Sequence, residues 1–157
     1  MIIDVDDFKS LITDYIESDP ASTNKVHSES GRLADSKFEE ELKTKKYSEL
    51  LIICGGSASG KTEFAHSFYE KEDSILIFII TLKNIGSVSS KLSHAYKQHI
   101  RKISILIIVP DNIEKCFYEF KQRVRQIDEN VFFDTHTRAI ALKYRGGEII
   151  KATTAQN

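Results

Sequence analysis

With 157 residues, of which 41% are hydrophobic and 29% charged, the chain has the length and composition of one globular domain with its own core. A formal net charge of −1 provides no overall attraction to nucleic acid, and no apolar run approaches the roughly 20 residues of a membrane-spanning helix. The acidic residues 1–7 do not resemble a secretory signal, and Cys54 and Cys116 are expected to be buried thiols. We therefore expect a cytoplasmic protein without a membrane partner.

The first 48 residues predict a helical extension ahead of the core. Apolar residues recur at helical spacing over residues 4–18, which predicts a first helix. Residues 20–31 are polar and are predicted to form a loop, whereas residues 33–46 predict a second, highly charged helix. We find no catalytic pattern in residues 1–48 and expect them to pack on the core or to cover the site.

One stretch matches the phosphate-binding loop G-x-x-x-x-G-K-[ST]; it consists of Gly55, Gly56, Ser57, Ala58, Ser59, Gly60, Lys61 and Thr62. A strand predicted over residues 49–54 and a helix over residues 60–71 supply the context that this motif needs. Glycines let successive backbone N–H groups face a phosphate, Lys61 would reach the outer phosphates, and the Thr62 hydroxyl would hold Mg²⁺. The stretch therefore predicts an ATP and Mg²⁺ site, the alternative being an ordinary turn rich in glycine and serine.

The rest of the chain alternates between strand and helix patterns. Strands are predicted over 74–81, 103–109 and 148–152, helices over 87–100 and 112–127, and no element over 128–145. This alternation predicts an α/β fold, a P-loop NTPase-like parallel sheet flanked by helices, with the N-terminal helical extension added to it.

The phosphate loop, residues 78–83 (FIITLK), residues 108–110 (IVP) and residues 120–125 (FKQRVR) resemble, in this order, the zeta-toxin family of P-loop kinases. The resemblance covers roughly residues 49–140 and makes 49–157 a P-loop kinase-like domain. It implies that Lys61, Arg123 and Arg125 are catalytic. It also implies phosphoryl transfer from ATP to a small hydroxyl-bearing acceptor such as the nucleotide sugar UDP-N-acetylglucosamine, with an antitoxin protein as partner.

The resembling family has a carboxylate near the end of the strand that precedes Thr81-Leu82, where this chain has Ile79 and Ile80. It also has a further strand between the first helix and this one, whereas here the helix runs almost directly into Ser74. An alternative function is therefore a catalytically impaired nucleotide-binding protein that acts through a partner. On this basis Ile79→Asp is expected to raise ATP turnover, unless Asp111 or Glu63 already supplies the acid.

Two further patterns leave alternatives open. His136 is expected either in a lid over the site or in an exposed loop. No acid occurs between Asp73 and Asp111, whereas basic residues do, namely Lys83, Lys91, Lys97, Arg101 and Lys102. This basic segment suits an anionic ligand or a solvated helix face. No nucleic-acid-binding module is recognised, so nucleic acid is not expected as a partner.

Overall fold

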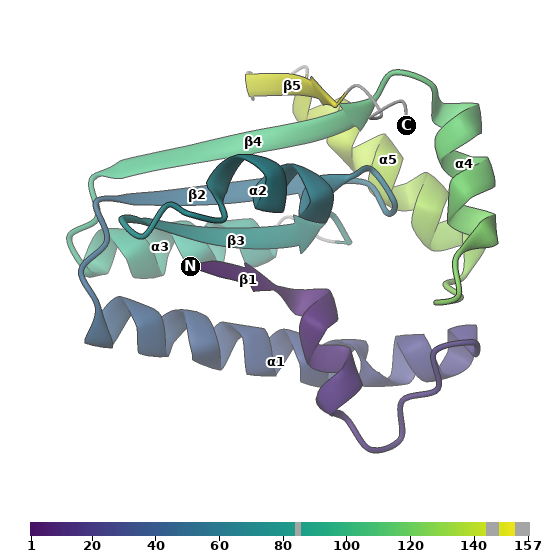
Figure 1. The fold of residues 1–157 in the computed structure, drawn as a ribbon, viewed down its shortest axis with the longest axis horizontal. Helices are drawn as coiled ribbons and strands as arrows, with labels where there is room; N and C mark the ends of the chain where they lie inside the picture. The colour runs from purple at the N-terminus through teal and green to yellow at the C-terminus, as the bar shows by residue number, and fades with distance from the viewer. Residues whose placement is uncertain (84–85, 144–147, 153–157) are drawn as a thin grey trace.

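A five-stranded sheet, in which all neighbouring strands are parallel, forms the centre of the molecule, in the order β1-β3-β2-β4-β5 (Figure 1). The computed structural model describes residues 1–83, 86–143 and 148–152. The strands are β1 (Ile2–Asp4), β2 (Glu49–Gly55), β3 (Ile75–Thr81), β4 (Lys102–Pro110) and β5 (Glu148–Ala152). The predicted α/β class and the predicted strands of the core are thus confirmed.

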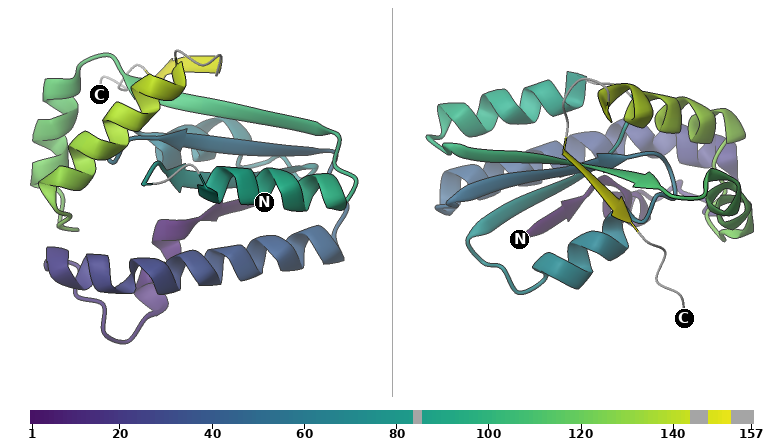
Figure 2. Two further views of the ribbon diagram at one scale, coloured as in Figure 1. Left: turned by 180° about the vertical axis from the view of Figure 1, so that it is seen from behind. Right: turned by 90° about the horizontal axis from the view of Figure 1, so that it is seen from above.

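Helices cover both faces of this sheet, as the view from above in Figure 2 shows. They are α1 (Pro20–Thr44), α2 (Lys61–Tyr69), α3 (Gly86–Lys97), α4 (Ile113–Gln122) and α5 (Glu129–Lys143). Apolar residues of α1, α3 and α5 form one buried cluster with the sheet, and α2 packs on the opposite face. Because side chains alternate along a strand, successive residues of β2 and β3 serve the two clusters in turn.

The N-terminal segment differs from its prediction. The helix expected over residues 4–18 is wrong: residues 2–4 form β1, and a short 3-10 helix η1 (Val5–Leu11) follows. The β-branched pair before Asp4 lies along the edge of β3, where the Ile77 N–H donates to the Met1 carbonyl over 2.9 Å. Strand pairing has therefore overridden the helical spacing of the apolar residues.

The loop predicted over residues 20–31 is also wrong, because α1 begins at Pro20. The Asp19 carboxylate accepts a hydrogen bond from the Ala21 N–H over 3.0 Å, which caps the helix. Proline is tolerated in the first turn because its missing N–H would have no helical partner there.

No element was predicted for residues 128–145. In the structure α5 occupies residues 129–143 of this stretch, and residues 144–145 lie outside the described part of the chain.

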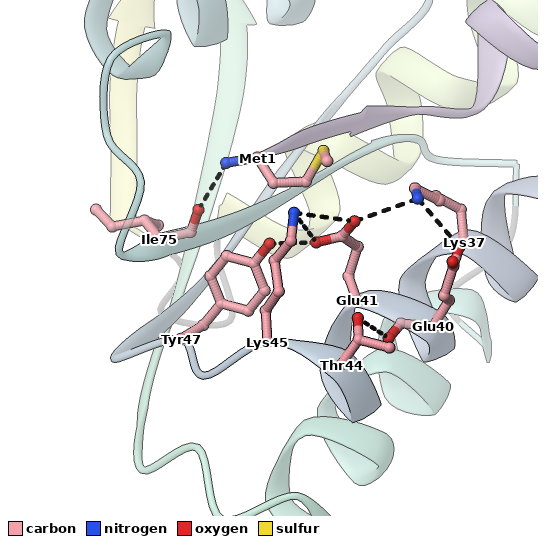
Figure 3. A network of polar contacts seen from close by, with 8 residues as sticks. All are labelled: Met1, Lys37, Glu40, Glu41, Thr44, Lys45, Tyr47 and Ile75. Atoms are coloured by element: carbon pink, nitrogen blue, oxygen red, sulfur yellow. Dashed lines mark hydrogen bonds and ion pairs between the residues drawn. The ribbon is translucent and has the colours of Figure 1, made fainter.

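A buried carboxylate ties α1 to the connection that leads into β2 (Figure 3). Glu41 is only 3% exposed, and its oxygens lie 3.2 Å from the Lys37 ammonium and 3.1 Å from the Lys45 ammonium. The Tyr47 hydroxyl donates a further hydrogen bond to it. Burial alone would raise the pKa of Glu41, but the hydrogen bonds from Tyr47 and the two lysines outweigh burial and lower the pKa.

We expect Glu41→Gln to lower the free energy of unfolding by about 2 kcal/mol, since a buried, charge-assisted network loses its anion. Chemical denaturation at pH 7 measures this loss, and Glu40→Gln, at an exposed position of the same helix, is the matched control. The lowered pKa means that Glu41 stabilises the fold above its ordinary value of 4.5 and loses this effect as the pH falls. The difference between wild type and Glu41→Gln should therefore shrink in acid; a constant difference would contradict this assignment.

Candidate phosphate site

The predicted phosphate loop connects β2 to α2 at the carboxyl end of the sheet. From β2 the chain proceeds to β3 on one side and later to β4 on the other, so β2 stands where the strand order reverses. Ligands of open α/β sheets bind in the crevice at such a point. Gly60 caps α2 with a left-handed φ of 85°, and Ala58 also has a positive φ of 60°. Two residues of the loop thus have left-handed backbone conformations, which curl the chain between β2 and α2.

The glycines at the start of the loop permit close contacts. A Cβ on Gly55 would lie 2.5 Å from the carbonyl oxygen of Ile108 in β4, a backbone atom that cannot turn away. A Cβ on Gly56 would lie 2.4 Å from ring atoms of His136. Both glycines are therefore needed for the close packing of the loop against β4 and α5.

Helix α5 braces the loop from outside. The Ser57 N–H donates to the Thr135 hydroxyl over 3.0 Å, and the Ser57 carbonyl accepts from the His136 Nε2–H over 2.8 Å. His136 is 4% exposed, so the exposed loop histidine proposed from the sequence is wrong. Burial lowers the pKa of His136, with Lys61 contributing in the same direction and the bond to Ser57 opposing. The neutral imidazole therefore acts here as a positioning group for the loop.

Gly56→Ala should lower the free energy of unfolding by about 1–3 kcal/mol, the usual cost of forcing extra volume into a packed site. The added methyl group meets the His136 ring, so combining it with His136→Ala should remove most of the penalty specific to Gly56→Ala. A double-mutant cycle by thermal denaturation measures this coupling. Additive effects of the two substitutions would contradict the contact.

Inside the loop, Lys61 and Ser59 face a pocket of about 330 Å³. Lys61 is 7% exposed, and its Nζ donates to the Gly56 carbonyl over 2.6 Å. Burial lowers the pKa of Lys61, an effect that the carboxylates of Asp6 and Asp4 oppose. The Ser59 hydroxyl is buried without a hydrogen-bond partner among the described residues. A phosphate oxygen would satisfy both groups.

Beside the position on β3 where the resembling family has a carboxylate and this chain has Ile79, the neighbouring strand β1 carries Asp4. Asp4 is the register partner of Ile79, and neighbouring residues in such a parallel pair point to the same face. The Thr62 hydroxyl donates to Asp4 Oδ2 over 2.6 Å. Sequence analysis missed Asp4, although an acid directly after the apolar pair at residues 2–3 is a signal for the end of a strand.

A second acid of the N-terminal segment links two cations. Asp6 lies 2.8 Å from the Lys9 ammonium and 3.0 Å from the Arg125 guanidinium. Burial alone would raise the pKa of Asp6, but Lys9 and Arg125 outweigh it and lower the pKa to about 2. Arg125 Nε is buried without a partner among the described residues. Asp6 thus stays ionised and holds Arg125 at the pocket.

The pocket also contains the other arginine predicted to be catalytic, Arg123, which forms the carboxyl cap of α4. Glu63 lines the pocket as well, whereas Asp111 is exposed and outside its lining. Asp7, which sequence analysis missed, lies at the rim; burial and then the neighbouring Asp4 and Asp6 raise its pKa. The pocket is therefore lined by Lys61, both arginines and carboxylates from the N-terminal segment.

Among the described residues, no cluster of three or more His, Cys, Asp or Glu side chains could hold a metal ion by itself. Asp4 and Thr62 offer oxygen ligands beside the loop, which suits Mg²⁺, an ion that commonly takes few protein ligands and completes its shell with phosphate oxygens and water. Both cysteines are free and buried, as predicted.

A second pocket of about 320 Å³ adjoins the first, and both are lined by Asp4, Asp6, Ser57, Ile79 and Thr81. It extends towards α1, with Lys9, His27, Arg32 and Lys83 among its lining side chains. The N-terminal segment thus contributes walls to both pockets.

Comparison with known proteins provides no family assignment: no protein-family model and no curated protein matches the chain. In the described part of the chain, none of the helices combines the length and the apolar character needed to cross a membrane.

Proposed function

We propose that the protein is a P-loop kinase that transfers a phosphoryl group from ATP to a small hydroxyl-bearing acceptor. One observation carries this proposal: the Thr62 hydroxyl donates a hydrogen bond to the Asp4 carboxylate, next to the buried Lys61. In nucleotide-binding loops of this kind a threonine and an acid from a neighbouring strand hold the metal, and the lysine contacts the outer phosphates. The strand order, which places the loop where the sheet reverses, supports the same P-loop arrangement.

The proposal assigns roles to several residues of the pocket. Lys61 and the loop N–H groups bind the outer phosphates, and Arg123 neutralises charge on the group being transferred. Mg²⁺, held on the protein side by Thr62 and Asp4, would draw charge from the phosphate oxygens. Asp7 has a pKa raised by burial and by its acidic neighbours, which suits a group that accepts the proton of the acceptor hydroxyl.

The alternative of an impaired nucleotide-binding protein arose from the isoleucines at positions 79 and 80. Asp4 supports the kinase instead, because it brings a carboxylate from the adjacent strand to the register position of Ile79. The zeta-toxin resemblance makes UDP-N-acetylglucosamine the first acceptor to assay, and an antitoxin the first protein partner to seek. Both remain parts of the proposal that rest on the resemblance.

Lys61→Ala is expected to weaken ATP binding at least tenfold, or by about 1.4 kcal/mol, because the loop loses its buried cation. Titration of a fluorescent ATP analogue in the presence of Mg²⁺ measures this affinity. Lys71→Ala is the control, since Lys71 is exposed beyond the end of α2 and lines neither pocket. Equal affinities of Lys61→Ala and wild type would overturn the phosphate-site assignment.

A further inference from the structure

The second pocket lies between the N-terminal segment and the end of β3, on the side of Asp4 away from the phosphate loop's α2. Residues from η1, α1 and the β3–α3 connection line it, notably Lys9, His27, Gly31, Arg32 and Lys83. Its volume of about 320 Å³ is at the lower end of the range for ligand pockets, about 300–1,000 Å³. It is therefore large enough for a small molecule.

Three cations, Lys9, Arg32 and Lys83, line the far wall of this pocket together with Asp35, whose carboxylate is paired with Lys91. Lys9 is 2% exposed and pairs with Asp6, so its charge is partly neutralised. Lys83, in contrast, has no carboxylate within 4.0 Å among the described residues. Burial, and then repulsion from Lys9, lowers the pKa of Lys83 to about 8. Asp6 offsets part of this repulsion, but Lys83 itself is left without a close carboxylate partner.

Two more groups on this wall, Arg32 and His27, could form a further ion pair or hydrogen bond with a ligand. Arg32 is exposed and forms no ion pair within 4.0 Å in the described part of the chain. Nδ1 of His27 is buried without a hydrogen-bond partner among the described residues. Burial, followed by the charges of Lys83 and Lys9, lowers the pKa of His27 to about 4, so its ring is neutral at pH 7. A neutral imidazole can donate one hydrogen bond to a ligand oxygen without adding further repulsion.

The wall formed by α1 is kept open by a glycine. Gly31 lies inside this long helix, where glycine costs roughly 0.5–1 kcal/mol relative to alanine. A Cβ at Gly31 would meet no atom within 4 Å, so neither packing nor backbone conformation requires the glycine. Because Gly31 lines the pocket, a larger side chain there would instead take up ligand space.

We propose that the second pocket binds the acceptor, and that this acceptor is a small hydroxylated anion, such as a sugar phosphate or a hydroxy acid, rather than a nucleotide sugar. The anionic group would lie against Lys83, Arg32 and His27. The hydroxyl group would point past Asp4 and Asp6, acids that line both pockets, towards Asp7 in the first pocket. The acceptor role rests on the proposed kinase function, whereas binding of a small anion in this pocket does not.

Two-dimensional NMR of the full chain can separate the two sites, with the Ser28 amide reporting on the second pocket and the Gly60 amide on the phosphate loop. We expect glycerol 3-phosphate to shift the Ser28 signal saturably and glycerol to leave it in place. Lys83→Met should weaken this binding at least tenfold, whereas Lys71→Met, at an exposed site, should not change it. Gly31→Leu should weaken it similarly without lowering the melting temperature, because leucine is the better helix former.

Absence of a saturable Ser28 shift would overturn the inference, as would unchanged affinity in Lys83→Met. Tighter binding of UDP-N-acetylglucosamine than of glycerol 3-phosphate at Ser28 would contradict the assigned size. Titration with Mg²⁺ and ATP, followed at Gly60, tests the kinase proposal separately. A Gly60 response without a Ser28 response to the small anion leaves that proposal standing and rejects this one. The reverse result rejects the kinase and with it the acceptor role, and leaves small-anion binding in the second pocket standing.

Discussion

Asp4→Asn is expected to lower ATP-dependent phosphoryl transfer at least about 10²-fold, while ATP affinity changes by no more than a few-fold. The amide keeps the size of the side chain but removes the charge that faces Thr62 at 2.6 Å. Lys61 and the loop N–H groups are untouched, so phosphate binding should survive. The loss should fall on the ordering of the metal and the acceptor, and higher Mg²⁺ concentrations should restore part of the rate. Steady-state kinetics with labelled ATP measure both effects.

Asp73→Asn is the matched control, because Asp73 is exposed before β3, at the opposite end of the strand, and lines neither pocket. With Asp4 in place, Ile79→Asp is no longer expected to raise turnover. Ile79 is 2% exposed, and a second carboxylate beside Asp4 would be buried next to a like charge. Undiminished transfer by Asp4→Asn would exclude this carboxylate from the mechanism.

Arg123→Ala should reduce turnover by a factor on the order of 10³ and change ATP affinity much less, as for an arginine that stabilises the transferring phosphoryl group. Arg123 is half-buried in the pocket and has no carboxylate within 4.0 Å among the described residues. Its charge is therefore available to a ligand. Single-turnover measurements separate the effect on transfer from the effect on binding.

Arg125→Ala provides the comparison, since the Arg125 guanidinium is held 3.0 Å from Asp6. Part of its charge is already neutralised, so the loss of turnover should be smaller than for Arg123→Ala. Loss of stability should be larger, because Asp6 is left with Lys9 as its remaining ion-pair partner among the described residues. The opposite order of the two variants in turnover would exchange the roles of the two arginines.

The sequence predicts the core of this fold well, because the signals for its strands and for the loop lie within short stretches of the chain. Strands β2, β3 and β4 are dense in β-branched residues, and a glycine motif marks the connection from β2 to α2. The N-terminal segment is predicted badly because its structure depends on a distant partner. Three residues form β1 only because the edge of β3 offers them hydrogen bonds. The apolar spacing in the residues that follow favours a helix when that partner is ignored.

The candidate site shows the same division. The loop residues and both arginines could be found from the motif and the order of segments, and the structure places them around one pocket. Asp4 could not be found in this way, because the strand register that aligns it with Ile79 joins residues far apart in the chain. Its contact with Thr62 likewise depends on strand order. The contact of His136 with the loop depends on α5, for which the weak periodicity of residues 128–145 provides no prediction.

The central claim is that an acid from the N-terminal strand and the threonine of the phosphate loop face one metal–nucleotide complex. Replacing Mg²⁺ by paramagnetic Mn²⁺ tests it directly, because Mn²⁺ broadens the NMR signals of nearby nuclei. With Mn²⁺ and ATP together, the amide signals of Asp4 and Thr62 should disappear. The signal of Ser74, which directly precedes the start of β3 and lies far from the loop, should persist. Mn²⁺ without ATP should have little effect at equal concentration. An Asp4 signal that stays sharp with Mn²⁺ and ATP would contradict the account.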